Sequence, residues 1–337
     1  MAVISLWFCA SCGDRGGARG GAGAGGGSDD VLVAPVDDEG VPLVVQRVAV
    51  VGDGAGDRAL VAVVRAMVWK RVNERPDLEW TEYEPNGAAE FDADVCVVVG
   101  GDRALVADVA QRAGTVVLVG DAVAAAGPVV ARVSADGELA AGQTGEAILA
   151  AAEGKGRVVM APVLADYPGA LRRMQQVEEY LQRAAPGTDQ KRLKLEYDGG
   201  GVESHVQCEQ WLTDALGMRV SEGELSAVVA VTRNATGDVL RRMRAIGLAE
   251  AVPVIGFGLD AEVASAMDDG EVTGTFVYDP GTLEACLRVA LDHAAGVKLG
   301  GPTNALPDQL VPLRWIDHAR LGSTDGRAIV APYLEAR

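Results

Sequence analysis

The chain has 337 residues, 48 of them acidic and 30 basic, so its formal net charge is −18 and its pI is near 4.6. At roughly 150 residues per domain this length predicts about two packing units, and the acidic balance argues against binding along a nucleic-acid backbone. Hydrophobic residues make up 49% of the chain but aromatic residues only 4%, and there are 43 glycines. The core is therefore expected to consist of small and β-branched side chains, as in many α/β proteins. No apolar run reaches the roughly 18 residues of a membrane span, and five cysteines are too few for a disulfide-dense fold.

The N-terminal stretch ends in two small residues and a cysteine, Ala10-Ser11-Cys12. It resembles the end of a bacterial lipoprotein signal peptide, in which the cysteine carries the lipid. Residues 1–12 are therefore interpreted as the remnant of such a signal, with its start upstream, and Cys12 as the lipidation site. Residues 13–28 hold nine glycines in sixteen positions, and we expect 13–43 to be a flexible tether. The alternative is a low-complexity leader on a cytoplasmic protein.

From residue 44 onward, apolar runs of strand length alternate with stretches whose apolar residues recur at helical spacing. Continuously apolar runs are typical of parallel strands that are covered on both faces. The expected strands are 44–51, 95–99, 116–119, 157–160, 193–197, 227–231, 252–255 and 273–278. The expected helices are 58–73, 104–112, 136–152, 167–185, 202–216, 238–248, 261–268 and 280–295. Two successive βαβ series predict two doubly wound, Rossmann-like lobes with parallel sheets.

Several segments in a fixed order carry a family resemblance. They are residues 133–142, 156–160, 225–232, 252–257 and 267–280. This ordered set is similar to the type I periplasmic binding proteins, the sugar-binding receptors of ATP-binding-cassette (ABC) importers. The resemblance covers roughly residues 45 to 298, and it implies two α/β lobes joined by a multi-strand hinge.

The resemblance also implies how the chain is divided between the lobes. Residues 44–135 plus 280–298 are expected to form the N-terminal lobe, and 136–279 the C-terminal lobe with its crossover. The tail, 299–337, holds one apolar run at 309–313 and is expected to pack partly on the lobes.

The same scaffold serves lactose-repressor-like regulators of transcription. Those proteins carry a helix-turn-helix where this chain has a glycine-rich tether, and the net charge of −18 opposes binding to DNA.

Ligands of parallel α/β sheets bind beyond the carboxyl ends of the strands, so the residues that follow each strand are the candidates. Carboxylates and arginines make paired hydrogen bonds to vicinal hydroxyls, and an aromatic ring packs on the C–H side of a sugar. The ligand-binding candidates are Asp53, Asp121, Tyr167, Arg172, Arg233, Phe257 and Tyr278. The resemblance implies that Asp121 grips a sugar hydroxyl, that Phe257 is the family's cleft aromatic, and that Arg172 lies on its arginine-containing helix.

Other positions depart from the pattern of the sugar binders. Ala122 replaces the family's arginine, Gly258 replaces an aspartate, and Tyr278 replaces a polar amide. Thr232-Arg233 stands where the family has an Asn-Asp pair. The Arg233 guanidinium favours an anionic ligand, so an ordinary sugar is not the only candidate. The alternatives are a turn-capping role for Asp121, a solvated charge for Arg233 and a core position for Phe257.

The glycine-rich loop at 52–57 invites comparison with nicotinamide-binding proteins. Its spacing is G-x-G-x-G, and Asp57 falls where the dinucleotide fingerprint needs a third glycine. His205 and Cys208 share a helix face but lack two further zinc ligands. We therefore expect no cofactor and no metal.

The sequence predicts an extracytoplasmic solute-binding protein rather than an enzyme. Its two lobes are expected to close on a small polar ligand, a sugar or a related polyol or anion, for an ABC permease or a membrane sensor. We expect a monomer in the periplasm or on the outer face of the cytoplasmic membrane, within the cell envelope, that is attached only by its lipid. The leading alternative is a sensing or degenerate binding module without transport, and a nicotinamide-dependent oxidoreductase is third.

Overall fold

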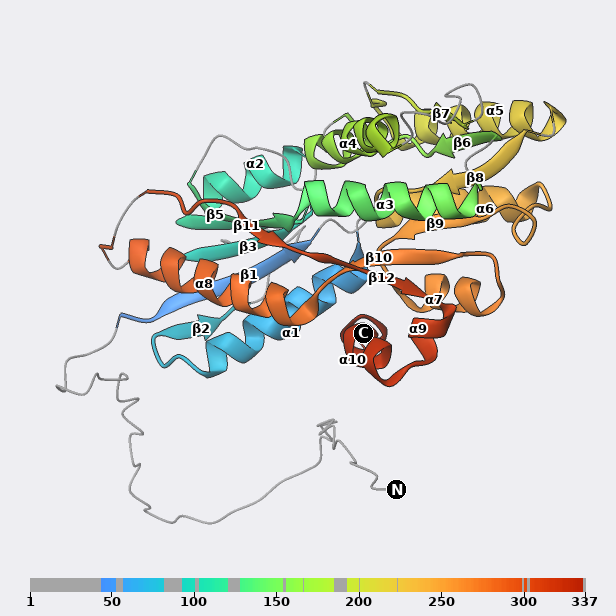
Figure 1. Ribbon diagram of the computed structural model, residues 1–337. Coiled ribbons are helices and arrows are strands. Elements are labelled where there is room, and N and C mark those ends of the chain that lie inside the picture. Colours follow the sequence, from blue (N-terminus) through green and yellow to red (C-terminus); the bar gives the residue numbers. More distant parts are fainter. Residues whose placement is uncertain are drawn as a thin grey trace, which may run out of the picture.

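The computed structural model describes residues 44–52, 57–81, 93–100, 103–120, 128–153, 156–165, 167–184, 193–199, 201–222, 224–298, 300–301 and 304–335. Within them the chain forms two six-stranded sheets with helices packed on their faces, one sheet in each half of the molecule (Figure 1). The predicted α/β class with two parallel-sheet lobes is confirmed. None of the helices in these residues is long and apolar enough to span a bilayer.

The first lobe is built on an entirely parallel sheet with the order β11-β5-β4-β3-β1-β2. Its strands are β1 (Gln46–Gly52), β2 (Leu78–Trp80), β3 (Val95–Val99), β4 (Thr115–Val119), β5 (Val129–Ala135) and β11 (Gln309–Val311). Its helices are α1 (Arg58–Asn73), α2 (Arg103–Arg112) and α8 (Pro280–Lys298). All of β3 is buried, because Cys96 and Val98 pack against α2 while the alternate residues face the core beneath α1 and α8.

The second lobe has the order β12-β10-β9-β8-β6-β7, in which only β12 is antiparallel to its neighbour. Its strands are β6 (Gly156–Met160), β7 (Leu193–Glu196), β8 (Leu225–Val229), β9 (Val254–Phe257), β10 (Gly274–Tyr278) and β12 (Leu313–Asp317). Its helices are α3 (Gly137–Ala151), α4 (Pro168–Ala184), α5 (His205–Glu222), α6 (Arg233–Ala245), α7 (Ala261–Asp268), α9 (His318–Gly322) and α10 (Thr324–Glu335).

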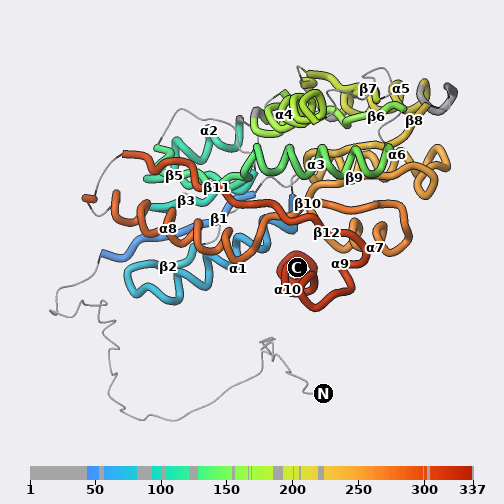
Figure 2. The backbone as a smooth tube through the Cα atoms, in the orientation of Figure 1, coloured from blue at the N-terminus to red at the C-terminus, as the bar shows by residue number. Residues whose placement is uncertain are grey.

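The chain passes between the lobes where β5 leads into α3, where β10 leads into α8, and where β11 leads into β12. Helix α3 packs on α4 and on strands of the second sheet, whereas α8 packs on β4 and β5 of the first. The last passage occurs at Pro312, and Figure 2 shows the tube running from one sheet to the other there. Two edge strands thus come from one short segment of the tail.

The tail and several helix boundaries differ from the sequence-based expectation. The single apolar run expected at 309–313 is split between β11 and β12, because Pro312 has no N–H to continue a ladder and Val311 and Leu313 are buried in different sheets. Helix α6 begins five residues earlier than expected, at Arg233, because the Thr232 hydroxyl caps it by accepting from the Ala235 N–H at 3.2 Å. Strands β2, β5 and β12 and helices α9 and α10 were not expected.

Helices α3 and α4 pack closely because α3 presents glycines to Tyr180 of α4. A Cβ atom at Gly145 would lie 2.2 Å from the Tyr180 ring, which is a steric clash. A Cβ atom at Gly142 would lie 3.6 Å from the same ring, which is an ordinary contact. The two glycines therefore differ in how much they tolerate a methyl group.

This difference predicts a measurable effect on stability. Both Gly145→Ala and Gly142→Ala gain helix propensity equally, but only the first forces the Tyr180 ring to move. We expect Gly145→Ala to be less stable than Gly142→Ala by about 1–3 kcal/mol in chemical unfolding. Equal stability of the two variants would contradict the close packing of these helices.

Candidate binding site

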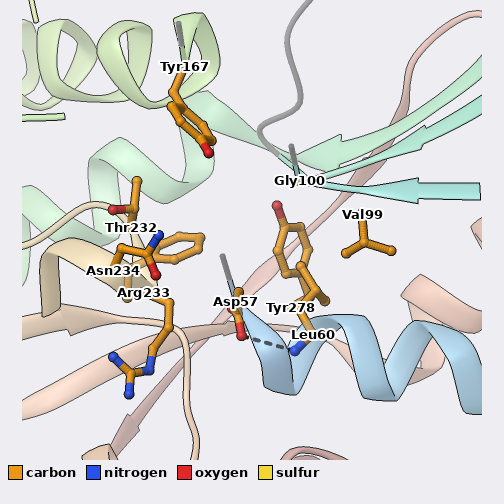
Figure 3. Close-up of a pocket in the computed structure, with 11 residues that line it drawn as sticks. Asp57, Leu60, Val99, Gly100, Tyr167, Thr232, Arg233, Asn234 and Tyr278 are labelled. Atoms are coloured by element: carbon orange, nitrogen blue, oxygen red, sulfur yellow. Dashed lines mark hydrogen bonds between the residues drawn. The ribbon is translucent and has the colours of Figure 1, made fainter. Parts of the chain in front are cut away.

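A cavity of about 70 Å³ lies between the two lobes. We call it the aromatic cavity, and Figure 3 shows its lining. The first lobe contributes Asp57, Leu60, Val99, Gly100 and Gly120, and the second contributes Tyr167, Thr232, Arg233, Asn234, Phe257 and Tyr278. Most lining residues follow or end strands β3, β4, β8, β9 and β10 or begin helices α1 and α6, and Tyr167 directly precedes α4. This is expected for a site at the carboxyl edges of parallel sheets.

Two buried aromatic side chains form the floor of this cavity. Phe257 ends β9 and Tyr278 ends β10, and their rings meet edge to face with centroids 6.2 Å apart. The Thr236 hydroxyl accepts from the Phe257 N–H at 2.9 Å and fixes the backbone there. The Tyr333 hydroxyl of α10 donates to the Tyr278 carbonyl at 2.8 Å. The backbone at both aromatic residues is therefore fixed by hydrogen bonds from neighbouring helices.

Asp57 faces the second lobe from the beginning of α1. Its carboxylate caps this helix by accepting from the Leu60 N–H at 3.0 Å. A Cβ atom at Gly258 in the second lobe, where φ is +78°, would lie 3.0 Å from Asp57 Oδ2. Burial raises the pKa of Asp57 to about 6, although the Leu60 N–H and the charge of Arg233 oppose this rise. Asp57 thus lies at the junction of the lobes, where burial disfavours the charged form of its carboxyl group.

Arg233 lines the aromatic cavity, but its guanidinium points away from it (Figure 3). Arg233 donates through Nε to Asp260 Oδ2 at 2.9 Å and through Nη2 to Glu262 Oε2 at 2.9 Å. Burial disfavours its charge, but the two carboxylates outweigh burial and raise the pKa of Arg233 above its ordinary value. The expectation that Arg233 recruits an anionic ligand does not fit this geometry, because its charge is already neutralised.

The structure brings together four of the residues predicted from the sequence and separates one. Tyr167, Arg233, Phe257 and Tyr278 all line the aromatic cavity. Arg172 lies on α4 and lines a different cavity. The remaining predictions fall outside the described residues, and these are Asp53, Asp121 and the lipidation site Cys12.

Three residues near the cavity were missed by the sequence analysis: Asp57, Asn234 and Arg173. Arg173 is buried, donates to the Val231 carbonyl and holds its guanidinium carbon 4.4 Å from the centre of the Phe257 ring. A signal for it was present, since the apolar face of α4 includes Ala170 and Val177. Residue 173 is three positions after the first and four before the second and so shares their face, while 172 turns away. The capping position of Asp57 before α1 was a similar signal.

The described residues hold little that points to catalysis. No group of three or more histidine, cysteine or acidic side chains in them is placed to hold a metal ion. Cys96 is buried, and burial raises the pKa of the Cys208 thiol to about 11. Neither thiol is a nucleophile at neutral pH, because the thiolate is the reactive form.

A family model described as a periplasmic binding protein domain matches residues 88–298. The chain belongs to the periplasmic binding protein family. No curated protein matches this periplasmic binding protein. The match covers most of both lobes, including β9 and β10, whose ends carry Phe257 and Tyr278.

Solved structures of transporter solute-binding proteins, the first two described as ABC transporter proteins and the third as a carbohydrate transporter protein, resemble this periplasmic binding protein in fold. One from Agrobacterium vitis, bound to α-D-tagatopyranose, is 12% identical, with a TM-score of 0.62 over 86% of this chain and 99% of its own. Another from A. vitis, with bound D-fucose, is 14% identical, with a TM-score of 0.63 over 84% and 99%. A third from Agrobacterium radiobacter, in complex with D-arabinose, is 15% identical, with a TM-score of 0.62 over 85% and 99%. These likenesses establish the fold.

Proposed function

We propose that this periplasmic binding protein captures a small polar ligand, a sugar or a related polyol or anion, between its lobes and delivers it to an ABC permease. The observation that carries the proposal is the aromatic cavity, which takes side chains from both lobes. A ligand that contacts both lobes stabilises their closed arrangement, and the partner recognises that closure. The sugars bound to the three solved solute-binding proteins support this ligand class.

The cavity offers the groups that a polyol needs. Asp57 supplies acceptor oxygens, and Asn234 supplies both donors and an acceptor. The Tyr167 hydroxyl points into the same space (Figure 3). The buried rings of Phe257 and Tyr278 suit the C–H face of a sugar. We propose that these groups bind and orient the ligand and that no bond is made or broken.

The size of the cavity bears on how a ligand reaches it. Its volume of about 70 Å³ lies below the roughly 300–1,000 Å³ of usual small-molecule sites. We therefore infer that the lobes move apart to admit a sugar and close again around it. Titration calorimetry with sugars, polyols and small anions, together with solution scattering, tests this function. We expect saturable binding by at least one compound and a decrease in the radius of gyration on binding.

Asn234→Ala is expected to weaken the binding of whichever neutral sugar binds by about 3–10-fold, because one or two neutral hydrogen bonds are lost. The matched control is Asn73→Ala, which makes the same change on α1. The Asn73 amide donates a hydrogen bond to the Trp69 carbonyl and does not line the aromatic cavity. We expect this control to bind like the unchanged protein in the same calorimetric titration. Equal affinity of both variants would remove Asn234 from the site.

Absence of binding by every compound, together with no compaction, would favour the sensing or degenerate module over a transport receptor.

For the localisation, we propose the periplasm or the outer face of the cytoplasmic membrane, with a lipid on Cys12. Mass spectrometry of the membrane fraction tests the lipid, and an unmodified Cys12 in a cytosolic fraction would contradict it. We further infer a monomer, which sedimentation measures directly.

A further inference from the structure

A second and larger cavity adjoins the aromatic one. Its volume is about 520 Å³, within the usual range for small-molecule sites. Gly120 lines both cavities, and Arg173 lines the larger one while its guanidinium stacks on Phe257 of the other. We call it the polar cavity. Its lining again comes from both lobes, with Arg132 and Ser134 from β5 of the first and with residues of α4 from the second.

Two arginines of the polar cavity have no partner within the described chain. Neither Arg132 nor Arg172 makes a hydrogen bond or an ion pair there, whereas Arg233 of the aromatic cavity has two carboxylate partners. Strand alternation explains how Arg132 reaches the cavity, because Arg132 and Ser134 project from one face of β5 while Ala131 and Val133 are buried on the other. The polar cavity therefore holds available positive charge from each lobe.

The other polar groups of this cavity are suited to hydroxyls. Asp136 is committed to capping α3, since its carboxylate accepts from the Leu139 N–H at 3.1 Å. Glu138 and Asp308 are exposed at the cavity, and with Asp136 they equal its three arginines in formal charge, but no ion pair joins them to Arg132 or Arg172 within the described residues. Together with Ser134 and Gln176 they offer acceptors and donors for a hydroxylated chain. The lining thus combines guanidinium groups for an anion with polar groups for several hydroxyls.

We propose that the polar cavity binds a small polyhydroxy acid, with Arg132 and Arg172 holding its carboxylate. A guanidinium pairs with a carboxylate through two parallel hydrogen bonds, which gives both strength and orientation. Because the two arginines come from different lobes, the carboxylate links the lobes when it is bound. This inference rests on the proposed receptor function and adds sugar acids, bound in the polar cavity, to the ligands of that receptor.

Calorimetric titration with matched pairs of probes tests the ligand class. Sodium D-gluconate is compared with D-glucitol, and sodium D-glucuronate with D-glucose. We expect at least one acid to bind ten or more times more tightly than its neutral counterpart. Arg132→Gln and Arg172→Gln are each expected to weaken binding of that acid at least tenfold and to leave any binding of neutral sugars unchanged.

Arg241→Gln is the control, because Arg241 is an exposed arginine of α6 that pairs with Asp238 and lines neither cavity. Its acid affinity is expected to stay unchanged. Since Arg132 and Arg172 have no partners in the described chain, their variants are expected to unfold at the same temperature as the unchanged protein. Neutral probes that bind as tightly as the acids, or acid binding that survives both substitutions, would overturn this inference and leave the receptor function standing. No binding by either class would overturn both.

Discussion

Asp57→Asn is expected to stabilise the protein by about 2 kcal/mol more at pH 7 than near pH 4. Burial raises the pKa of Asp57 from 3.8 to about 6 in the folded protein. Between these two pH values the folded state therefore binds the proton more tightly than the unfolded chain does, and the free energy of unfolding falls as the pH rises. Asparagine cannot ionise, so its variant avoids this loss, which is about 1.4 kcal/mol for each unit of pKa difference.

Denaturant unfolding of both proteins between pH 4 and pH 7 measures this effect. The stability difference should grow through this window and level off above pH 6. Asparagine also accepts the Leu60 N–H, so the cap of α1 is retained. Asp57→Ala removes the charge and the cap together and is expected to be about 1 kcal/mol less stable than Asp57→Asn at every pH. Parallel pH profiles for the unchanged protein and Asp57→Asn would contradict a buried, ionising Asp57.

Tyr333→Ala is expected to lower the free energy of unfolding by about 3–5 kcal/mol, the usual cost of removing a buried aromatic side chain. Tyr333 is 2% exposed, and its helix α10 packs against α1 of the first lobe. Burial raises the pKa of its hydroxyl well above the ordinary value, so the hydroxyl stays protonated and donates to the Tyr278 carbonyl. The side chain thus supports both the packing of α10 and the position of a cavity residue.

Tyr333→Phe separates these two contributions. It keeps the ring and removes only the hydroxyl, so the Tyr278 carbonyl loses its buried donor at a cost of about 1–3 kcal/mol. Urea unfolding with a fluorescence readout measures both variants. A loss below 1 kcal/mol for Tyr333→Ala would show that α10 does not pack on the lobes as described.

Much of the fold could be predicted from continuous apolar runs, and β5 shows where that signal ends. Strand β3 was predicted with its exact bounds, because every residue of it is apolar and buried. Strand β5 was missed, because Arg132 and Ser134 interrupt its apolar pattern. Those two residues face the polar cavity. The apolar pattern therefore failed to predict β5 because two of its side chains line a cavity instead of packing in the core.

The candidate site was predictable as a region but not in its details. The rule that ligands bind beyond strand ends selected Tyr167, Phe257 and Tyr278, which the structure brings together at one cavity. The same rule selected Arg233, but a sequence does not show that Asp260 lies close enough to neutralise it. Adjacent arginines on α4 were also hard to separate, since only helix rotation decides that one is buried and that the other, Arg172, is exposed.

The segment 309–317 supplies an edge strand to each sheet, β11 to the first and β12 to the second. The sheet of the first lobe therefore cannot be completed by β11 until nearly the whole chain has been synthesised, although its strand β1 begins at Gln46. Until then β5 and β10 present unpaired edges, which are templates for association with other chains. The two lobes thus complete their folding together and late, when the last thirty or so residues have been made.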